Sequence, residues 1–210
     1  MGERKYEQRL RAESAEATRR RVLDALERRL QEAPTQPISL EEIATSAGVA
    51  RSTVYLIFGS RAGLFDALAT DLWERAGLAR LTEAVADPDA RKHLRGGLRA
   101  GVEIFAAMRD AANALFSMSS LDPESVGGAM NRLEVRRWGG MLHLARRLAE
   151  QDLLRDDMTI EDAANVLWLL ASFGSFDALY SGRGMSSNEV ADVLIAMAER
   201  SLYAEPLSRA

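Results

Sequence analysis

The chain has 210 residues, with 27 Lys and Arg against 31 Asp and Glu, two histidines and no cysteine. A chain of this length forms one or two domains and can bury a hydrophobic core. The lack of cysteine excludes a disulfide scaffold, a cysteine nucleophile and thiolate metal sites. Two isolated histidines offer poor material for a Ser–His–Asp triad or a histidine metal site. We therefore expect no catalytic residues, no metal and no cofactor.

No run of 18 apolar residues occurs, and the first 21 residues are charged throughout, without the apolar segment of a secretory signal. These features predict a cytoplasmic protein that does not cross a membrane. Charge is unevenly distributed, because residues 1–63 contain 11 basic and 9 acidic side chains whereas the remaining residues contain 16 and 22. A basic N-terminal part on an acidic body favours a nucleic-acid contact near the N-terminus.

Apolar residues recur at helical spacing along nearly the whole chain, and no long stretch alternates as a strand does. We therefore predict an all-α fold of about nine helices. The first helix is expected over residues 15–32, and Pro34 prevents its continuation. Ser39 then begins a short helix through a capping box with Glu42 at the third helical position, and Gly48 ends this helix.

A second short helix is expected over residues 51–58, and Ser60 caps a longer helix that ends before Asp87. The segment over about 90–119 is expected to form two helical pieces, and a long helix is expected from Pro123 past Leu148. A further helix is expected over 159–182, with Thr159 and Asp162 at its start. The last helix is expected over 186–203, beginning at Ser186 or Ser187.

Residues 39–68 place two short helices on either side of a turn that contains Gly48. This is the arrangement of a helix-turn-helix, in which a short first helix and a tight turn let the second helix enter a major groove about 12 Å wide. Gly48 is expected at positive φ, where a Cβ would be costly. The outer face of the second helix then presents Arg51, Ser52, Thr53, Tyr55 and Leu56.

The same segment resembles the DNA-binding signature of the tetracycline-repressor (TetR) family. The resemblance rests on the pattern Ile43-Ala44-x-x-Ala47-Gly48-Val49-x-x-x-Thr53-Val54-Tyr55-x-x-Phe58-x-Ser60-Arg61-x-x-Leu64. It implies a helix-turn-helix DNA-binding domain over residues 1–60, with the signature extending to about residue 68, and a ligand-binding and dimerisation domain over residues 61–210. Two positions depart from the family pattern, because Ala50 replaces a small hydroxyl residue that would cap the second helix and Arg61 replaces a lysine.

Candidate DNA contacts form three groups. Phosphate contacts that position the protein on the duplex are expected from the helix start that Ser39 caps. They are also expected from the side chains of Thr53, Tyr55 and Arg61. Tyr55 has an alternative role as a half-buried brace of its helix. Arg51 and Ser52 are expected to read base edges, Arg51 by pairing with guanine O6 and N7, although a phosphate contact or a solvated position would also suit Arg51. The third group, Arg19, Arg20 and Arg21, is either a set of phosphate contacts or a solvated helix start, and the charged segment before it is a candidate for the minor groove.

Two sites are predicted in the C-terminal domain. The last two helices, 159–182 and 186–203, are expected to form a homodimer, as the resemblance implies, through small residues such as Ala171, Gly174, Ala178 and Ala198; the alternative is a monomer with these helices in its core. A pocket for a small apolar or aromatic effector is predicted from flexible and aromatic side chains, each of which could instead belong to the core. These side chains are Trp73, Phe105, Met108, Phe116, Met130, Trp138, Met141 and Trp168.

These observations predict a sequence-specific transcriptional regulator without enzymatic activity, most simply a repressor released from a palindromic operator by its effector. The helix that starts at Ser60 is expected to transmit effector binding from Trp73 to the DNA-binding helices. One alternative is a helix-turn-helix protein that acts without a ligand, as an activator or architectural factor. An all-α enzyme is a distant third, because the sequence contains no phosphate loop or metal motif. The operator, the effector and the regulated genes do not follow from the sequence.

Overall fold

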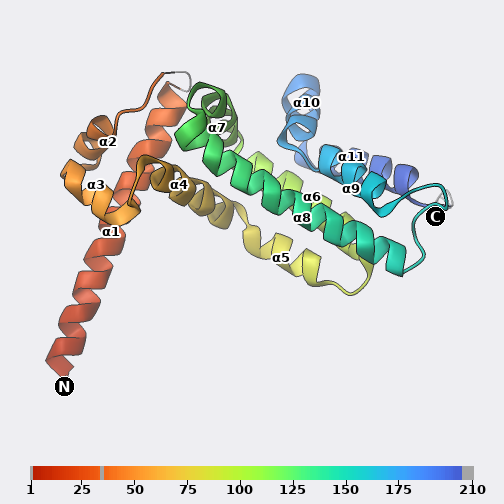
Figure 1. The fold of residues 1–210 in the computed structure, drawn as a ribbon, viewed down its shortest axis with the longest axis horizontal. Coiled ribbons are helices and arrows are strands. Elements are labelled where there is room, and N and C mark those ends of the chain that lie inside the picture. Colours follow the sequence, from red (N-terminus) through yellow and green to blue (C-terminus); the bar gives the residue numbers. More distant parts are fainter. Residues whose placement is uncertain (1, 34–35, 205–210) are drawn as a thin grey trace. The chain divides into compact units, whose positions relative to one another are not determined.

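The computed structural model of the chain describes residues 2–33 and 36–204 (Figure 1). Within these ranges the chain consists of helices and connecting loops, with no strand, which confirms the all-α prediction. None of the described helices combines the length and the apolar character needed to span a membrane. In chain order the elements are α1 (Gly2–Glu32), α2 (Leu40–Ala47), α3 (Arg51–Phe58), α4 (Arg61–Ala76), α5 (Leu78–Ala86), α6 (Ala90–Ala107), α7 (Arg109–Leu121), the π-helical turn η1 (Pro123–Gly127), α8 (Gly128–Glu150), α9 (Ile160–Leu170), α10 (Phe173–Arg183) and α11 (Ser187–Leu202).

The first helix, α1, is longer than predicted. It begins at Gly2 instead of near residue 15, so the charged segment before Arg19 belongs to the same helix. In Figure 1 the N-terminal half of α1 extends beyond α2 and α3, away from both helices. A helix is about 10–12 Å across whereas the minor groove is about 6 Å wide. The minor-groove contact predicted for this segment would therefore require the helix to unwind.

Two of the predicted helices are each divided into two. The segment 61–86 is interrupted at Gly77, whose φ of 112° lies in the left-handed region that favours glycine. The segment 159–182 is interrupted at Ala171, and Ser172 begins α10 by accepting a hydrogen bond from the N–H of Ser175 at 3.1 Å. Apolar spacing continues across both interruptions, so the sequence pattern alone did not reveal them.

Other helix starts are confirmed as predicted. Thr159 and Asp162 form a capping box at α9, and Ser186 forms one with Glu189 at α11. The hydroxyl of Ser60 accepts a hydrogen bond from the N–H of Gly63 at 3.0 Å, at the start of α4. These interactions connect residues three positions apart, which is why they could be recognised in the sequence.

The capping box predicted at Ser39 is only half correct. Ser39 is the N-cap of α2, and its hydroxyl accepts a hydrogen bond from the N–H of Glu41 at 3.2 Å. The carboxylate of Glu42 instead accepts a hydrogen bond from Nε of Arg29, on α1, at 2.7 Å. A charge-assisted hydrogen bond to a guanidinium is stronger than one to a neutral backbone N–H. The glutamate therefore joins two helices instead of closing one.

The contacts of the chain divide it into two compact units. The first unit contains the residues up to Asp71 together with Asp110–Asn131, and the second contains Leu72–Arg109 and the residues from Arg132 onward. Helices α4, α7 and α8 contribute residues to both units, α7 only through Arg109. The functional division near residue 60 stays a prediction.

The core of the first unit orients the N-terminal helices. Helix α2 packs against α1 and α3. Fully burying one Leu or Phe side chain contributes about 1.5–3 kcal/mol to folding, so burial of apolar residues at helical spacing is the main favourable contribution in this unit. The buried side chains include Val22, Leu26, Ile43, Ala44, Val54, Phe58, Leu64, Phe65 and Leu68.

Helix α6 is the central helix of the second unit. Helices α5, α10 and α11 pack against it, and α9 packs against α10 and α11. The C-terminal part of α8 fastens the start of α6, because Arg147 Nη1 donates to Nδ1 of His93 at 2.8 Å and Nη2 donates to the carbonyl of Asp87 at 2.5 Å. His93 is 4% exposed. Its burial, together with the Arg147 charge, lowers the pKa of His93 to about 4.

Candidate nucleic-acid interface

The turn between α2 and α3 has the predicted conformation. Gly48 adopts φ 66° and ψ 40°, the left-handed conformation expected after a helix. The N–H of Val49 donates to the carbonyl of Ala44 at 3.0 Å, and the N–H of Gly48 donates to that of Thr45 at 3.1 Å. Ala44 and Val54 are both buried at the contact of the two helices. The turn is therefore held by local hydrogen bonds and by a close helix–helix contact.

Helix α3 begins without a side-chain cap. Ala50 is the N-cap residue, with an extended backbone and no side-chain hydrogen bond. Its carbonyl accepts a hydrogen bond from the N–H of Thr53 at 2.9 Å. The first N–H groups of any helix have no partner within that helix. At this end α3 therefore presents backbone donors suited to an anion such as a phosphate group.

The outward face of α3 carries polar and apolar side chains together. Val54 is buried on the inner face and Thr53 is half-buried. Tyr55 is 42% exposed, so its two predicted roles, a phosphate contact and a half-buried brace of its helix, both stay predictions. The exposed side chains of the helix are Arg51, Ser52, Tyr55 and Leu56.

Arg51 lies along the side chain of Tyr55. Its Nη2 donates to the tyrosine hydroxyl oxygen at 3.4 Å, and its guanidinium carbon is 5.6 Å from the ring centroid. This hydrogen bond and the electrostatic attraction to the tyrosine raise the pKa of Arg51. A permanent cation and a hydroxyl group thus stand one helical turn apart on an exposed surface. Both groups suit phosphate oxygens, and arginine also suits the acceptor edge of guanine.

The three consecutive arginines of α1 have different surroundings. Arg20 forms ion pairs within the first unit, with Nη1 2.5 Å from Oδ1 of Asp71 and Nε 2.9 Å from Oδ1 of Asp24. These carboxylates raise the pKa of Arg20. The guanidinium carbon of Arg19 lies 5.2 Å from the ring centroid of Phe58. Arg21 is exposed, and its guanidinium lies beside the Gly48 turn. Of the three, Arg21 is best placed for a phosphate contact.

Arg61, predicted to contact phosphate, instead forms an ion pair within its own unit. Its Nη2 lies 2.7 Å from Oδ2 of Asp122, and its guanidinium carbon lies 5.9 Å from the ring centroid of Phe65. Asp122 also accepts a hydrogen bond from the N–H of Ser125 at 3.1 Å and so caps η1. This ion pair holds Nη2 of Arg61 within the first unit, and the phosphate contact of Arg61 stays a prediction. A partner 61 positions away could not be foreseen from local spacing.

Arg29 has a positioning role that no pattern in the sequence indicated. Besides its bond to Glu42, it donates to the carbonyls of Ala33 and Pro37 at 3.1 and 3.3 Å. It thereby fixes the approach of the chain to α2, where Ser39 caps the helix at an exposed position. The only signal in the sequence is an arginine in the last turn of a helix, which does not identify these partners.

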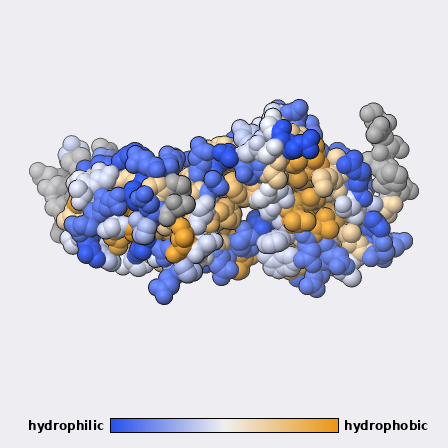
Figure 2. Space-filling model, turned by 90° about the horizontal axis from the view of Figure 1, so that it is seen from above, coloured by the Kyte–Doolittle hydropathy of each residue, from blue (hydrophilic) through white to orange (hydrophobic). Residues whose placement is uncertain are grey.

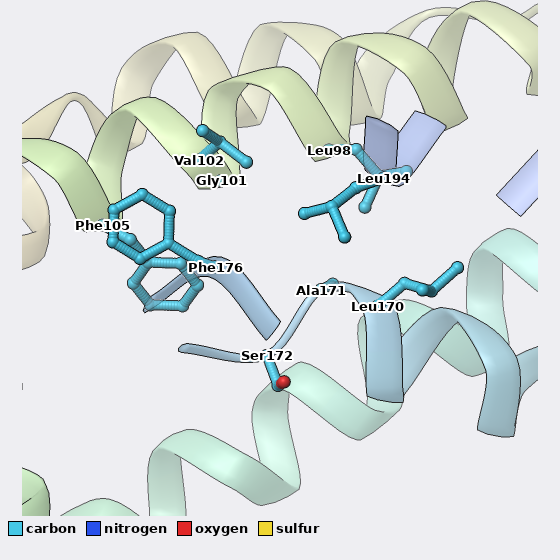
Figure 3. Close-up of a pocket in the computed structure, with 9 residues that line it drawn as sticks. All are labelled: Leu98, Gly101, Val102, Phe105, Leu170, Ala171, Ser172, Phe176 and Leu194. Carbon is cyan, nitrogen blue, oxygen red and sulfur yellow. The ribbon is translucent and has the colours of Figure 1, made fainter. Parts of the chain in front are cut away.

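A small apolar cavity lies in the second unit (Figure 3). Its volume is about 20 Å³, which is room for about one water molecule. Figure 3 shows the hydroxyl of Ser172 pointing away from the space, which leaves hydrocarbon groups around it. The lining residues come from α6, from the end of α9, the break after it and α10, and from α11. They are Leu98, Gly101, Val102, Phe105, Leu170, Ala171, Ser172, Phe176 and Leu194.

Of the eight side chains predicted to line a pocket, only Phe105 lines this cavity. Trp73 contacts Phe105 edge to face, with ring centroids 5.9 Å apart. Trp168 is 38% exposed and lies beneath the guanidinium of Arg137, with the guanidinium carbon 4.7 Å from its ring centroid. The remaining five are not among the lining residues: Met108, Trp138 and Met141 belong to the second unit and Phe116 and Met130 to the first. Residue type had selected them, whereas helix packing decides which side chains share a space.

Exposed apolar side chains gather on the C-terminal helices. Leu169 on α9 is 60% exposed and Met197 on α11 is 44% exposed. Figure 2 shows hydrophobic residues grouped over this part of the chain, on the right of the view. Of the four small residues predicted at a dimer contact, Gly174 and Ala178 are exposed, Ala171 is half-buried, and Ala198 is fully buried inside its own protomer. Ala198 therefore cannot meet a partner from its present position.

Comparison with known proteins identifies a family model and solved structures that are similar to this chain. Residues 22–68 match the model of the bacterial regulatory proteins of the tetR family. No related sequence was found among curated proteins. Solved structures with this fold cover most of the chain, but their sequence identity to it is low.

Three of these structures illustrate the range of sequence identity to this chain. NalD of Pseudomonas aeruginosa, the secondary repressor of the MexAB-OprM multidrug efflux pump, is 25% identical, with a TM-score of 0.67 over 90% of this chain and 97% of its own. A TetR-family regulator from Rhodococcus sp. is 16% identical, with a TM-score of 0.65 over 89% and 99%. A regulator from Saccharomonospora viridis, solved in complex with choline, is 20% identical, with a TM-score of 0.63 over 88% and 97%.

Proposed function

Because the chain belongs to the tetR family of bacterial regulatory proteins and is a DNA-binding regulator of transcription, we propose that it is a homodimeric repressor that leaves a palindromic operator when a small apolar effector binds. The observation that carries the DNA-binding part is the capped α2, the left-handed Gly48 turn and the exposed face of α3. This arrangement is the one required to present a helix to a major groove.

The proposed contacts follow from exposure and pairing. Arg51 and Ser52 are assigned to base edges, because both are exposed on α3. Tyr55 and Arg21, with the N-terminus of α2 at Ser39, are assigned to phosphate groups. Thr53 is half-buried, and we assign a phosphate contact only to its hydroxyl group. Arg20 and Arg61 both form ion pairs with carboxylates, and we assign them first to holding the first unit together.

The dimer is proposed to form through the C-terminal helices. A single helix-turn-helix makes few base contacts, and a two-fold dimer doubles them on a palindromic site. The exposed Leu169 and Met197 supply apolar surface on α9 and α11, and the exposed Gly174 and Ala178 allow a helix to approach α10 closely. This surface would be buried in the dimer.

The effector is proposed to enter at the cavity of the second unit. At about 20 Å³ the cavity holds no drug-sized molecule, so binding requires the surrounding helices to separate. Phe105 lines the cavity and contacts Trp73, which lies in the same helix, α4, as Phe65 and Leu68 of the first unit's core. A displacement of Phe105 can therefore tilt α4 and change the spacing of the two recognition helices, which must match about 34 Å on the operator.

The test begins with selection of bound duplexes from a random library, using the full-length protein. The expected result is one palindromic site whose affinity falls steeply with salt, because basic side chains release counterions from the DNA. A selected site without two-fold symmetry would contradict the dimer.

With the site known, Arg51→Ala is expected to relax the preference at one base pair per half-site by about 1–3 kcal/mol, whereas Tyr55→Phe weakens all duplexes alike.

A second candidate function is ligand-independent regulation, because the cavity of the second unit holds no drug-sized molecule in its present conformation. The two functions separate in a thermal-shift screen of apolar and aromatic compounds, since a compound that binds the folded protein raises its melting temperature by mass action. An effector must also bind more weakly when operator is present, by the same factor by which it weakens operator binding, about 5–150-fold. Trp73→Ala is expected to reduce this coupling more than operator affinity. A ligand whose affinity is equal with and without operator would contradict the transmission through α4.

A further inference from the structure

Leu56 is the most exposed large apolar side chain in the described part of the chain. Its exposed fraction is 86%, compared with 63% for the next, Val135. It lies in α3, in the sequence Arg51-Ser-Thr-Val-Tyr-Leu-Ile-Phe58. The apolar side chains that α3 needs for packing are Val54 and Phe58, which are buried on the opposite face. Leu56 therefore adds nothing to the core of this unit, and its side chain projects into solvent.

The groups around Leu56 limit what it can meet. Ser52 lies one turn earlier on the same face, about 6 Å along the helix axis. The guanidinium of Arg51 and the hydroxyl of Tyr55 lie on the adjacent face and suit phosphate and base acceptors. A surface that combines a cation, two hydroxyl groups and one large hydrocarbon group matches a major groove that contains both acceptors and an apolar group. It does not match a partner surface that is uniformly apolar.

The floor of the major groove presents one apolar group, the C5-methyl of thymine. We propose that Leu56 reads sequence by packing against a thymine methyl in each half-site, about one or two base pairs from the base contacted by Ser52. This inference rests on the proposed DNA-binding function and adds a specificity-determining residue and its target base to it. An exposed hydrocarbon side chain gains free energy when it and the methyl group leave water together. Removing one buried methyl group is expected to weaken binding about fourfold.

The experiment exchanges thymine for deoxyuridine, which lacks only the C5-methyl group. In the selected operator each thymine is replaced in turn, symmetrically in both half-sites, and affinity is measured by fluorescence anisotropy at one salt concentration. The wild-type protein is expected to lose about fourfold per half-site, about 15-fold in total, at one thymine position and little elsewhere. Leu56→Ala is expected to bind the thymine operator more weakly by a similar factor and to show no further loss with deoxyuridine.

Two controls make the result specific. Val135→Ala removes an exposed side chain from α8 and is expected to keep the full deoxyuridine effect. Thermal unfolding of Leu56→Ala is expected to match wild type, since the side chain is exposed and alanine favours helix. A wild-type protein insensitive to every thymine methyl, an operator without thymine in its half-sites, or a Leu56→Ala variant that keeps the deoxyuridine effect would overturn the inference. A Leu56→Ala variant that binds DNA normally but self-associates less would assign Leu56 to a second copy of the chain and also overturn it. Failure to select any specific duplex would contradict the proposed function itself.

Discussion

The helix-turn-helix and the cavity of the second unit are both built around a break between two helices, and the two breaks differ in how they are held. Between α2 and α3 the break depends on Gly48, whose φ of 66° is accessible to few residues other than glycine. Between α9 and α10 it depends on Ser172, with φ −84° and ψ 153°, a conformation open to any residue. Both breaks contain local hydrogen bonds, but only the first also requires a backbone conformation that favours glycine.

This difference suits the two proposed tasks. A recognition helix must keep one orientation, because its side chains have to meet base edges within hydrogen-bond distance. A cavity of about 20 Å³ must widen before it admits an effector, and the Ala171–Ser172 break forms part of its wall. The hydroxyl of Ser175 donates to the carbonyl of Leu169 at 2.6 Å across this break. Loss of a few such bonds would let α10 move without unfolding.

The largest expected effect concerns the wall of the cavity. Phe176→Ala should lower the free energy of unfolding by about 3–5 kcal/mol, because the ring is fully buried and contacts Phe105 and Tyr180. Urea unfolding measures this cost, with Val135→Ala as a surface control expected within about 0.5 kcal/mol of wild type. The enlarged space should also bind small aromatic molecules more tightly. A cost below about 1 kcal/mol would mean that the aromatic cluster is loosely packed.

The next effect is pH dependence confined to the second unit, which contains both histidines of the chain. Burial lowers the pKa of His93 in the folded protein to about 4, below its ordinary value of about 6.5. The unfolded chain therefore binds a proton first as the pH falls, and stability decreases from pH 6.5 down to about 4, by up to roughly 3 kcal/mol. The stability difference between wild type and His93→Gln, measured by urea unfolding across this range, isolates the effect from the carboxylates. A difference that does not vary with pH would refute it.

A matched pair of variants tests the comparison of the two breaks directly. Gly48→Ala should cost about 1–2 kcal/mol of stability and weaken operator binding, since an L-residue is strained at this φ. Ser172→Ala should cost about 1 kcal/mol through loss of the α10 cap, with operator affinity unchanged and ligand affinity altered. Calorimetry and operator titration of both variants provide the measurement. Equal loss of operator binding in both would show that the second break is as rigid as the first.

The smallest effect concerns the ion pair between Arg61 and Asp122. Arg61→Ala should lower stability by about 1 kcal/mol and weaken operator binding, because it removes the ion pair. Asp122→Ala should cost about 1 kcal/mol more, because it also removes the hydrogen bond by which Asp122 caps η1. The double variant should lose little more than Asp122→Ala alone, because the ion pair is already lost in that variant. The contrasting outcome is that Arg61→Ala alone weakens binding and reduces the salt dependence by about one phosphate contact, while Asp122→Ala tightens it. That result would restore the phosphate contact expected for Arg61.

Much of the fold could be read from the sequence because it depends on neighbours in the chain. The all-helical architecture, the Gly48 turn and the capping boxes at Thr159 and Ser186 each involve residues within about four positions of one another. The exposed face of α3 also follows from helical periodicity once Val54 is recognised as buried. For such features the local backbone conformation and the hydrogen-bond partners are set by the same few residues.

The tertiary structure decided which candidate side chains are already paired and which enclose a space. Arg19, Arg20 and Arg21 are identical in type and adjacent in the chain, yet only Arg20 meets Asp71, 51 positions away. The cavity likewise contains only Phe105 of the eight side chains predicted for it. An ion pair or a void depends on where distant helices pack, and periodicity within one helix shows which face is buried but not what lies opposite it.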